Sequence, residues 1–401
     1  MKITHIHIER FRGFQNEDFE VGSLLTAIAG QNGTQKSTLL GIITQTFTLK
    51  TEDSMRVEKP LCGGSYISAF KDKFRLSPTF DKPKGHEWTI SFDAGMDDFT
   101  VESIKRTGDP NVRFWKKGAR QEGDGYISFP TIFLSLKRLV PVAEEAKIIT
   151  DDTLLTQEEL NEFKQLHNKI LIAQTPISSA TTITSKNKQS IGVSTELYDW
   201  NQNSMGQDNL GKIILALFSF KRLHDKYPRQ YKGGILAIDE MDATMYPASQ
   251  VELLKVLRKY ASKLNLQILF TTHSMSLLKA MDDLVQEVTK KEETANQAKI
   301  LYLKKVDDKI AIKQGVNFKG IQLDLNVVAE GNNRKKNRIT AYTEDKENIL
   351  FVKAILKSKA FVLDFVDVTL PCSTLMELVT KRVPAFIYPY SIAVSYTHLT
   401  L

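Results

Sequence analysis

Cysteine is scarce in this sequence of 401 residues, which contains only Cys62 and Cys372. Two distant cysteines argue against a disulfide framework and against a cysteine-rich zinc site. No apolar run approaches the roughly 20 residues of a membrane-spanning helix, and the first residues alternate polar and apolar side chains without the apolar centre of a signal peptide. We therefore expect a cytoplasmic protein without membrane contact.

Internal repeats and long low-complexity tracts are also missing, so we expect successive compact domains. A chain of 401 residues, with 42% hydrophobic and 25% charged residues, has room for two or three domains and a large core. The 54 Lys and Arg against 47 Asp and Glu give a net charge of +7, which is compatible with a polyanionic partner. The densest basic stretch, 332–338, is equally typical of a solvated linker.

Strands alternate with helices along most of the chain, which predicts an α/β fold built on a mixed sheet whose core strands are parallel. The expected core strands are 24–29, 130–139, 234–238 and 266–271. One expected helix starts near Lys36, and three more cover 156–172, 209–221 and 249–264. The expected domains are a head at 1–331, with a β-rich insertion at 52–125 and a helical insertion at 150–200, and a C-terminal unit at 332–394.

A glycine-containing turn follows the first core strand and precedes a helix rich in Leu and Ile. A P-loop requires this context, because backbone N–H groups at the start of a helix then converge on phosphate oxygens. The turn predicts a nucleotide site at Gly30, Gln31, Asn32, Gly33, Thr34, Gln35, Lys36, Ser37 and Thr38. Lys36 would neutralise the outer phosphates and Ser37 would hold Mg²⁺, so ATP and Mg²⁺ are the expected ligands.

Gln35 stands where the pattern G-x-x-x-x-G-K-[ST] has its second glycine. If the backbone at this position has a positive φ, a side chain there costs on the order of 1 kcal/mol. This departure puts nucleotide affinity or turnover in question more than it does the fold.

Two later core strands end in polar side chains, since Asp239 and Glu240 follow one of them and His273 follows the other. Asp239 would complete the magnesium shell beside the P-loop, and Glu240 would orient or deprotonate the attacking water. Because parallel strands end at one edge of a sheet, the P-loop, the acidic pair and the histidine predict one ATPase site. Lys36, Glu240 and His273 are its expected catalytic residues.

These motifs resemble those of ATP-binding-cassette ATPases of the SMC, RecF and OLD kind. In that family a turn like Phe11-Arg12-Gly13 precedes the P-loop, and a signature of the type S-x-G-[QE] lies upstream of the Asp-Glu strand. The resemblance implies that Ser204, Gly206 and Gln207 contact the γ-phosphate held by the other subunit of a head-to-tail homodimer. It also implies that His273 is a switch residue.

Two further assignments follow from the same resemblance. Asp242 resembles the dimer-interface loop of the family. The family's magnesium-sensing glutamine loop has three candidates in this sequence, namely Gln45, Lys137 and Arg138.

The segment after residue 331 has a strand, a glutamate and a helix in succession, with Glu344 between the expected strand 338–343 and the expected helix 345–357. This pattern resembles the TOPRIM nuclease domain of OLD-family proteins, which implies an acid–base or metal-binding role for Glu344. The family continues with a strand that ends in Asp-x-Asp, whereas the corresponding strand here ends at Val394. Because a two-metal nuclease needs several carboxylates, we expect no DNA cleavage by this chain. A small α/β dimerisation or capping unit without chemistry is the alternative.

The last seven residues, 395–401, differ in character from those before them and resemble a translated adapter sequence. We expect them to be a non-native tail and exclude them from fold reasoning. The TOPRIM-like domain is then incomplete.

The sequence leaves three functions open. The first is an ATP-hydrolysing ATPase whose nucleotide-driven dimerisation controls a nuclease domain acting on DNA, in bacterial anti-phage defence. The second is a scaffold that binds ATP, hydrolyses it slowly because of Gln35 and recruits a separate effector or nucleic acid. The third is a RecF-like DNA-repair ATPase without a nuclease. A large gain in turnover on restoring glycine at position 35 would favour the second.

Overall fold

The computed structural model describes the chain except for residues 68–69, 94, 106–111, 120–124, 140–147, 153, 186–188, 331–338, 382–390 and 395–401. The chain divides into two compact units, Met1–Leu323 and Asp324–Leu401. This division falls a few residues before the boundary at 331 expected from the sequence. The basic stretch 332–338 and the expected tail 395–401 lie outside the described residues.

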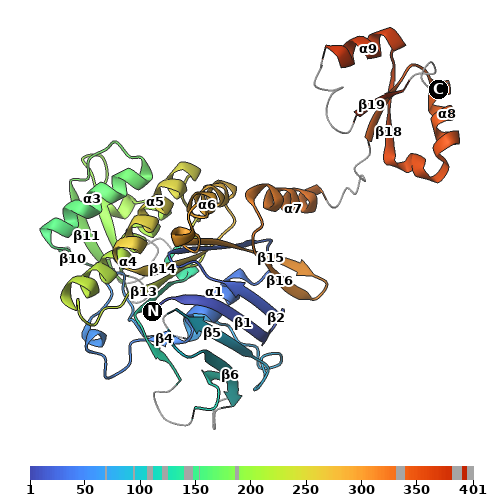
Figure 1. Ribbon diagram of the computed structural model, residues 1–401. Coiled ribbons are helices and arrows are strands. Elements are labelled where there is room, and N and C mark those ends of the chain that lie inside the picture. Colours follow the sequence, from blue (N-terminus) through green and yellow to red (C-terminus); the bar gives the residue numbers. More distant parts are fainter. Residues whose placement is uncertain are drawn as a thin grey trace. The chain divides into compact units, whose positions relative to one another are not determined.

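A six-stranded sheet forms the centre of the first unit (Figure 1). Its strands, in spatial order, are β16 (Lys309–Lys313), β15 (Ala298–Val306), β3 (Leu25–Gly30), β14 (Leu266–Thr272), β13 (Gly234–Ile238) and β9 (Thr131–Leu134). Neighbours from β15 to β9 are parallel, and β16 pairs antiparallel with β15. Because β3, β13 and β14 are parallel, their carboxyl ends share one edge of the sheet, and the predicted motifs follow those ends.

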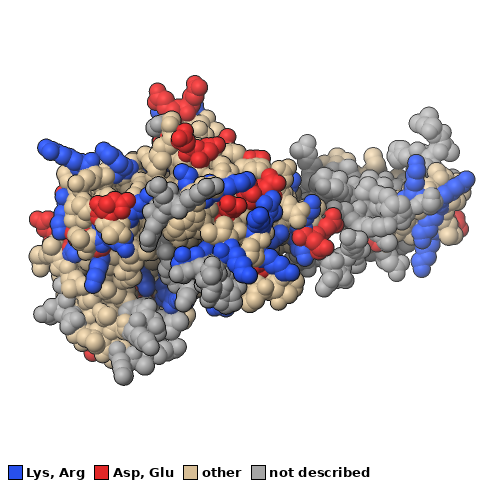
Figure 2. Space-filling view, turned by 90° about the horizontal axis from the view of Figure 1, so that it is seen from below, with Lys and Arg blue, Asp and Glu red and all other residues tan. Residues whose placement is uncertain are grey.

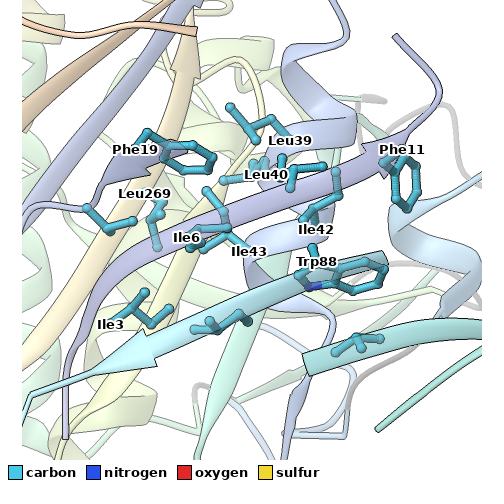
Figure 3. Close-up of a cluster of buried hydrophobic side chains, with 14 of the residues drawn as sticks. Ile3, Ile6, Phe11, Phe19, Leu39, Leu40, Ile42, Ile43, Trp88 and Leu269 are labelled. Carbon is cyan, nitrogen blue, oxygen red and sulfur yellow. The ribbon is translucent and has the colours of Figure 1, made fainter. Parts of the chain in front are cut away.

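An antiparallel sheet packs against the other side of helix α1 (Lys36–Thr44). Its strands, in spatial order, are β2 (Phe14–Glu20), β1 (Ile3–Phe11), β5 (Glu87–Phe92), β6 (Phe99–Lys105) and β7 (Val112–Lys116). In Figure 3, Ile42 and Ile43 of α1 lie with Ile6, Trp88 and Leu269 in one apolar cluster drawn from both sheets. Residues 39–44 of α1 are all buried, as expected for a helix that lies between two layers.

Further helices and two small sheets complete the first unit. The helices are α2 (Phe70–Lys73), α3 (Gln157–Leu171), α4 (Met205–Lys226), α5 (Pro247–Lys263) and α6 (Met275–Val288). The small sheets are β10 (Ile149–Asp152), β11 (Ser179–Thr184) and β12 (Gln189–Ser194), and the pair β4 (Phe47–Thr48) and β8 (Ile127–Ser128). Capping boxes at Thr156 and Ser204 begin α3 and α4, which explains why these helices start at those positions.

Three elements differ from the sequence expectations. The expected strand 130–139 ends at Leu134 and gives way to a 3₁₀ helix, Leu136–Leu139, because the side chain of Arg138 turns back and donates to the carbonyl oxygen of Leu134. The insertion 150–200, expected to be helical, contains α3 but also the sheet β10–β11–β12. The hairpin β15–β16 was not predicted, although it extends the central sheet by two strands.

The second unit has a three-stranded parallel sheet of its own. The strands are β18 (Leu363–Thr369), β17 (Ile339–Thr343) and β19 (Ser391–Val394), with α8 (Lys346–Leu356) and α9 (Cys372–Thr380) between them in the sequence. Ala341, Val352 and Leu363 form its small core. The division between the units falls within α7 (Phe318–Glu330). The expected strand–helix alternation of this segment is therefore present.

Two further features of the described residues concern the distribution of charged side chains and the apolarity of the helices. In Figure 2 the Lys and Arg side chains on the visible face lie among Asp and Glu side chains, so the net positive charge is spread over the described residues of that face. Within the described ranges, no helix combines the length and the apolarity needed to cross a membrane.

Candidate functional site

The loop between β3 and α1 has the backbone of a phosphate-binding turn. Gly30 and Gly33 have positive φ angles of 153° and 80°. A Cβ atom on Gly30 would lie 2.4 Å from the carbonyl oxygen of Leu303, so only glycine fits there. Lys36 Nζ turns into the loop and donates to the carbonyl oxygens of Gly30 (3.1 Å) and Gln31 (2.9 Å). One ammonium group and the N-terminus of α1 therefore meet at the loop.

Gln35 has the left-handed backbone considered in the sequence analysis, with φ 62° and ψ 32°. Its side chain packs against the turn after β1, since a Cβ atom on Gly13 would lie 2.9 Å from Gln35 Nε2. Gln35 Oε1 is buried and has no hydrogen-bond partner among the described residues. The loop thus keeps a conformation suited to glycine, and the strained backbone costs about 1–2 kcal/mol.

Asp239 lies directly beside the loop. It is 5% exposed, and its Oδ1 accepts hydrogen bonds from Ser37 Oγ (2.9 Å) and Thr271 Oγ1 (2.7 Å). Thr271 in turn accepts the backbone N–H of Glu240 (2.6 Å). The start of α1 and the ends of β13 and β14 are therefore joined by one chain of hydrogen bonds.

Glu240 and His273 complete this edge of the sheet. Glu240 has a positive φ of 50° and a half-buried side chain. His273 is exposed, and its backbone N–H donates to Asp242 Oδ1 (3.3 Å). Partial burial, and then the nearby charge of Lys36, lower the pKa of His273, which favours the neutral imidazole. The three expected catalytic residues are thus at one sheet edge.

The expected signature residues lie at the start of α4. Ser204 Oγ accepts the backbone N–H of Gln207, and Gln207 Oε1 accepts the backbone N–H of Ser204, in a reciprocal capping box. A Cβ atom on Gly206 would lie 2.5 Å from the carbonyl oxygen of Thr244, so this glycine allows α4 to approach the loop 240–244. The Ser204 side chain is exposed at a helix N-terminus, where an anion is stabilised.

The three candidates for the glutamine loop occupy different environments. Gln45 is buried at the end of α1 and hydrogen-bonds Tyr126. Lys137 is exposed on the 3₁₀ helix after β9. Arg138 is buried and donates to the carbonyl oxygen of Glu240 (2.8 Å), so it is the candidate in direct contact with the acidic strand end.

Glu344 belongs to the second unit, where it follows the last residue of β17. The backbone N–H of Cys372 donates to Glu344 Oε1 at 3.4 Å. No group of three or more His, Cys, Asp or Glu in the described ranges could hold a metal ion. The described residues therefore do not assemble a nuclease metal centre around Glu344.

A cavity of about 720 Å³ lies beside the turn after β1 and is lined by Arg10, Arg12 and Arg75 among others. Arg12 Nη1 lies 3.4 Å from Thr38 Oγ1, which links the cavity to the start of α1. Arg12 also pairs with the buried carboxylate of Asp81 (3.0 Å), which fixes its direction. The cavity was not foreseen, because Asp81 and Arg75 lie in a segment that was assigned only as a β-rich insertion.

The side chains at the strand ends fit a magnesium ion bound together with phosphates. Mg²⁺ in such sites takes one or two protein ligands and several phosphate or water oxygens, and does not need a cage of carboxylates. Ser37 Oγ and Asp239 Oδ1 lie 2.9 Å apart and supply one hydroxyl and one carboxylate oxygen. Thr271 orients Asp239 through a hydrogen bond and was not predicted as a site residue. Its position at the polar end of a core strand is the feature of the sequence that could have indicated it.

The pKa of Lys36 leads to a first testable prediction. Burial lowers this pKa to about 8, although Glu240, Asp239 and Asp242 oppose the shift. Bound phosphates would raise the pKa of Lys36 again. Above pH 8 this side chain is largely deprotonated before the nucleotide binds, so binding takes up a proton, whereas near pH 7 it is already protonated and binding takes up none. We expect the Kd for ATP to rise by up to about ten-fold per pH unit above that point.

Titration calorimetry in buffers of different ionisation enthalpy measures this proton uptake. Glu240→Gln removes one carboxylate that opposes the shift, so it should move the onset of uptake to lower pH. Binding without proton uptake above pH 8 would contradict the assignment of Lys36 to the phosphates.

Comparisons with known proteins show which family model and which solved structures the chain resembles. Residues 135–278 match the family described as "AAA ATPase domain". The matched range contains α4, β13 and β14, and therefore Asp239, Glu240 and His273. The match thus covers the acidic strand end and His273, and the glycine-containing loop at 30–38 lies outside it.

Solved structures that resemble the chain include an SMC head domain from Thermotoga maritima, with 14% identity, a TM-score of 0.43 and coverage of 79% of this chain and 100% of that one. Another is an SMC head bound to the C-terminal winged-helix domain of ScpA, with 14% identity, a TM-score of 0.47 and coverage of 80% and 100%. A third is the recombination mediator RecF, with 11% identity, a TM-score of 0.39 and coverage of 78% and 98%. A search of curated proteins found no match.

Proposed function

We propose that this protein is an ATP-hydrolysing ATPase of the SMC and RecF kind that works as an ATP-dependent homodimer. The observation that carries the proposal is the chain of hydrogen bonds from Ser37 through Asp239 and Thr271 to Glu240, beside Lys36. The AAA ATPase domain match over 135–278 supports the reaction class.

In the proposed mechanism each side chain has one task. Lys36 neutralises the outer phosphates, and its preference for the charged form rises when they bind. Ser37 and Asp239 would hold Mg²⁺, which would neutralise charge that develops on the phosphates. Glu240 orients the attacking water and takes its proton. Neutral His273 donates a hydrogen bond towards the γ-phosphate.

The nucleoside would extend towards the cavity of Arg12. The acidic strand ends and Lys36 occupy the side of the loop that receives the outer phosphates, and Thr38 lies one residue beyond Ser37 along α1. The contact between Arg12 and Thr38 supports a cation close to the α-phosphate.

The second subunit would complete the site through α4. Ser204, Gly206 and Gln207 form a capped helix N-terminus with an exposed hydroxyl, which suits a γ-phosphate held by another chain. Dimerisation would then control the second unit, whose strand, Glu344 and helix resemble the start of a TOPRIM domain. DNA as the target and anti-phage defence as the setting belong to this proposal through the resemblance to OLD-family proteins.

The test is ATP hydrolysis by the full chain, with its oligomeric state followed by light scattering with and without ATP and Mg²⁺. We expect ATP hydrolysis and a monomer that becomes a dimer when ATP binds. Hydrolysis by a protein that stays monomeric at all concentrations would contradict the shared site, and absence of both would contradict the ATPase assignment.

The strained Gln35 favours a second candidate, a sensor that binds ATP, hydrolyses it poorly and recruits an effector. Gln35→Gly decides between the two. Because Gln35 already has the left-handed backbone, we expect glycine to change kcat by less than about three-fold. A gain of more than about thirty-fold, roughly 2 kcal/mol in the barrier, would favour the sensor. Gly13→Ala is a useful companion, because a methyl group there would press on the Gln35 amide.

A further inference from the structure

Arg138 is a buried cation at the end of β9, with 2% exposure. Its Nε donates to Asn209 Oδ1 (2.7 Å), and its Nη2 donates to the carbonyl oxygen of Glu240 (2.8 Å). Its Nη1 donates to the carbonyl oxygens of Leu134 (3.2 Å) and Ser135 (3.1 Å). All four acceptors are uncharged, while the nearby carboxylates of Asp239, Glu240 and Asp242 stabilise the charge of the guanidinium group. Arg138 therefore joins three segments of chain and does not simply neutralise one carboxylate.

Asn209 extends this connection into α4. It is fully buried in the second turn of the helix, and its Nδ2 donates to the carbonyl oxygen of Ala243 (3.0 Å). One turn earlier, Gly206 packs against the carbonyl oxygen of Thr244. The start of α4, which carries the expected signature, thus contacts the loop 240–244 at two points.

The loop 240–244 has a strained backbone. Glu240 and Thr244 have positive φ angles of 50° and 67°, and each costs about 1–2 kcal/mol in a residue with a Cβ atom. Such conformations persist where neighbouring groups hold them, and Arg138 and Asn209 provide two of the holding hydrogen bonds. The backbone of Glu240 is therefore connected to α4 through Arg138 and Asn209.

We propose that Arg138 and Asn209 couple the two nucleotides of the dimer. When the start of α4 engages the nucleotide of the partner subunit, this pair of side chains fixes Glu240 of the same chain for its own nucleotide. The inference rests on the proposed ATP-dependent dimer. In that dimer each chain becomes catalytically competent only when its own signature contacts the nucleotide of the partner subunit. Arg138 is then a positioning residue, because it acts through the backbone of Glu240.

Two substitutions test the positioning role. Arg138→Lys keeps the charge but cannot reach Asn209 and Glu240 together, and Asn209→Asp keeps the acceptor for Arg138 but loses the donor to the loop. We expect each to lower kcat by about ten- to a hundred-fold while the Kd for ATP stays within about two-fold. Arg222→Lys, on the same helix but paired with Glu159, is the matched control and should keep the original turnover. A general loss of thermal stability, ATP binding and turnover together in both variants would indicate a merely structural role and overturn the proposal.

Mixed dimers, isolated with two different tags, test the direction of coupling. One protomer carries Ser204→Asp, which retains a helix cap but repels a phosphate; its partner carries Glu240→Gln. This dimer has one complete site, made of the first protomer's Glu240 and the partner's unaltered signature, but the first protomer's α4 is not engaged. We expect at least about ten-fold lower turnover than in a dimer of an unaltered protomer with a Glu240→Gln partner.

Equal turnover in the two mixed dimers would overturn the coupling. A failure of the proposed function itself gives a different result, because the unaltered protein would then lack ATP hydrolysis or ATP-dependent dimerisation in the same assays.

Discussion

Glu240→Gln should lower ATP turnover by about a hundred- to ten-thousand-fold, because an amide cannot accept the proton of the attacking water. The amide is nearly isosteric and leaves the backbone N–H bond to Thr271 in place, so the site should still assemble. ATP binding is therefore retained, and the dimer should accumulate because the step that dissolves it is blocked. Light scattering with ATP and Mg²⁺ measures this trapped dimer.

Glu287→Gln is the matched control for this variant. Glu287 is exposed on α6 and pairs with Arg258, so the same substitution there should leave turnover and dimerisation unchanged. Hydrolysis by Glu240→Gln at the unaltered rate would remove Glu240 from the mechanism, and the carboxylate of Asp242 would be the next residue to examine.

Lys36→Ala should weaken ATP binding by at least about a hundred-fold and abolish hydrolysis. The substitution removes a buried ammonium group that lies in the loop, within reach of phosphates that would bind there, and charge-assisted hydrogen bonds are the strongest polar contacts available. Binding of a fluorescent ATP analogue, followed by anisotropy, measures the affinity directly.

Lys73→Ala provides the control at the opposite end of α1. Lys73 is also buried and donates to a backbone carbonyl, that of Thr44 (2.8 Å). Its loss should reduce thermal stability and leave the affinity for ATP unchanged within about two-fold. Equal loss of ATP affinity in both variants would mean that the effect comes from a loosened α1 and not from the phosphates.

Most of the elements were predictable because their signals are local. The strand 234–238 agrees with the structure at both ends, since a short apolar run between turn formers leaves few alternatives. The partners Ser37 and Asp239 were also predictable, because parallel strands end at one edge of a sheet. These predictions rest on the spacing of apolar residues along the sequence and on the geometry of a parallel sheet.

Contacts between distant segments were not predictable. Arg138 follows an apolar run and was assigned to a strand, whereas its guanidinium group leaves the strand to bind Asn209 and Glu240. The sheet β10–β11–β12 was hidden by the clear helical spacing of α3. The contact of Gln35 with Gly13 depends on how the antiparallel sheet lies over α1, which one sequence does not encode in any local pattern.

The packing of Gln35 against Gly13 has an evolutionary consequence. The glycine that is missing from the phosphate loop has a counterpart in the turn after β1, where Gly13 leaves room for the Gln35 amide. A side chain at position 13 would also meet Ile310 Cγ1, 2.7 Å from the added Cβ atom. Positions 13 and 35 should therefore covary among homologues. A homologue with glutamine at 35 should retain Gly13, whereas a homologue with glycine at 35 has no amide side chain that a Cβ atom at position 13 would meet.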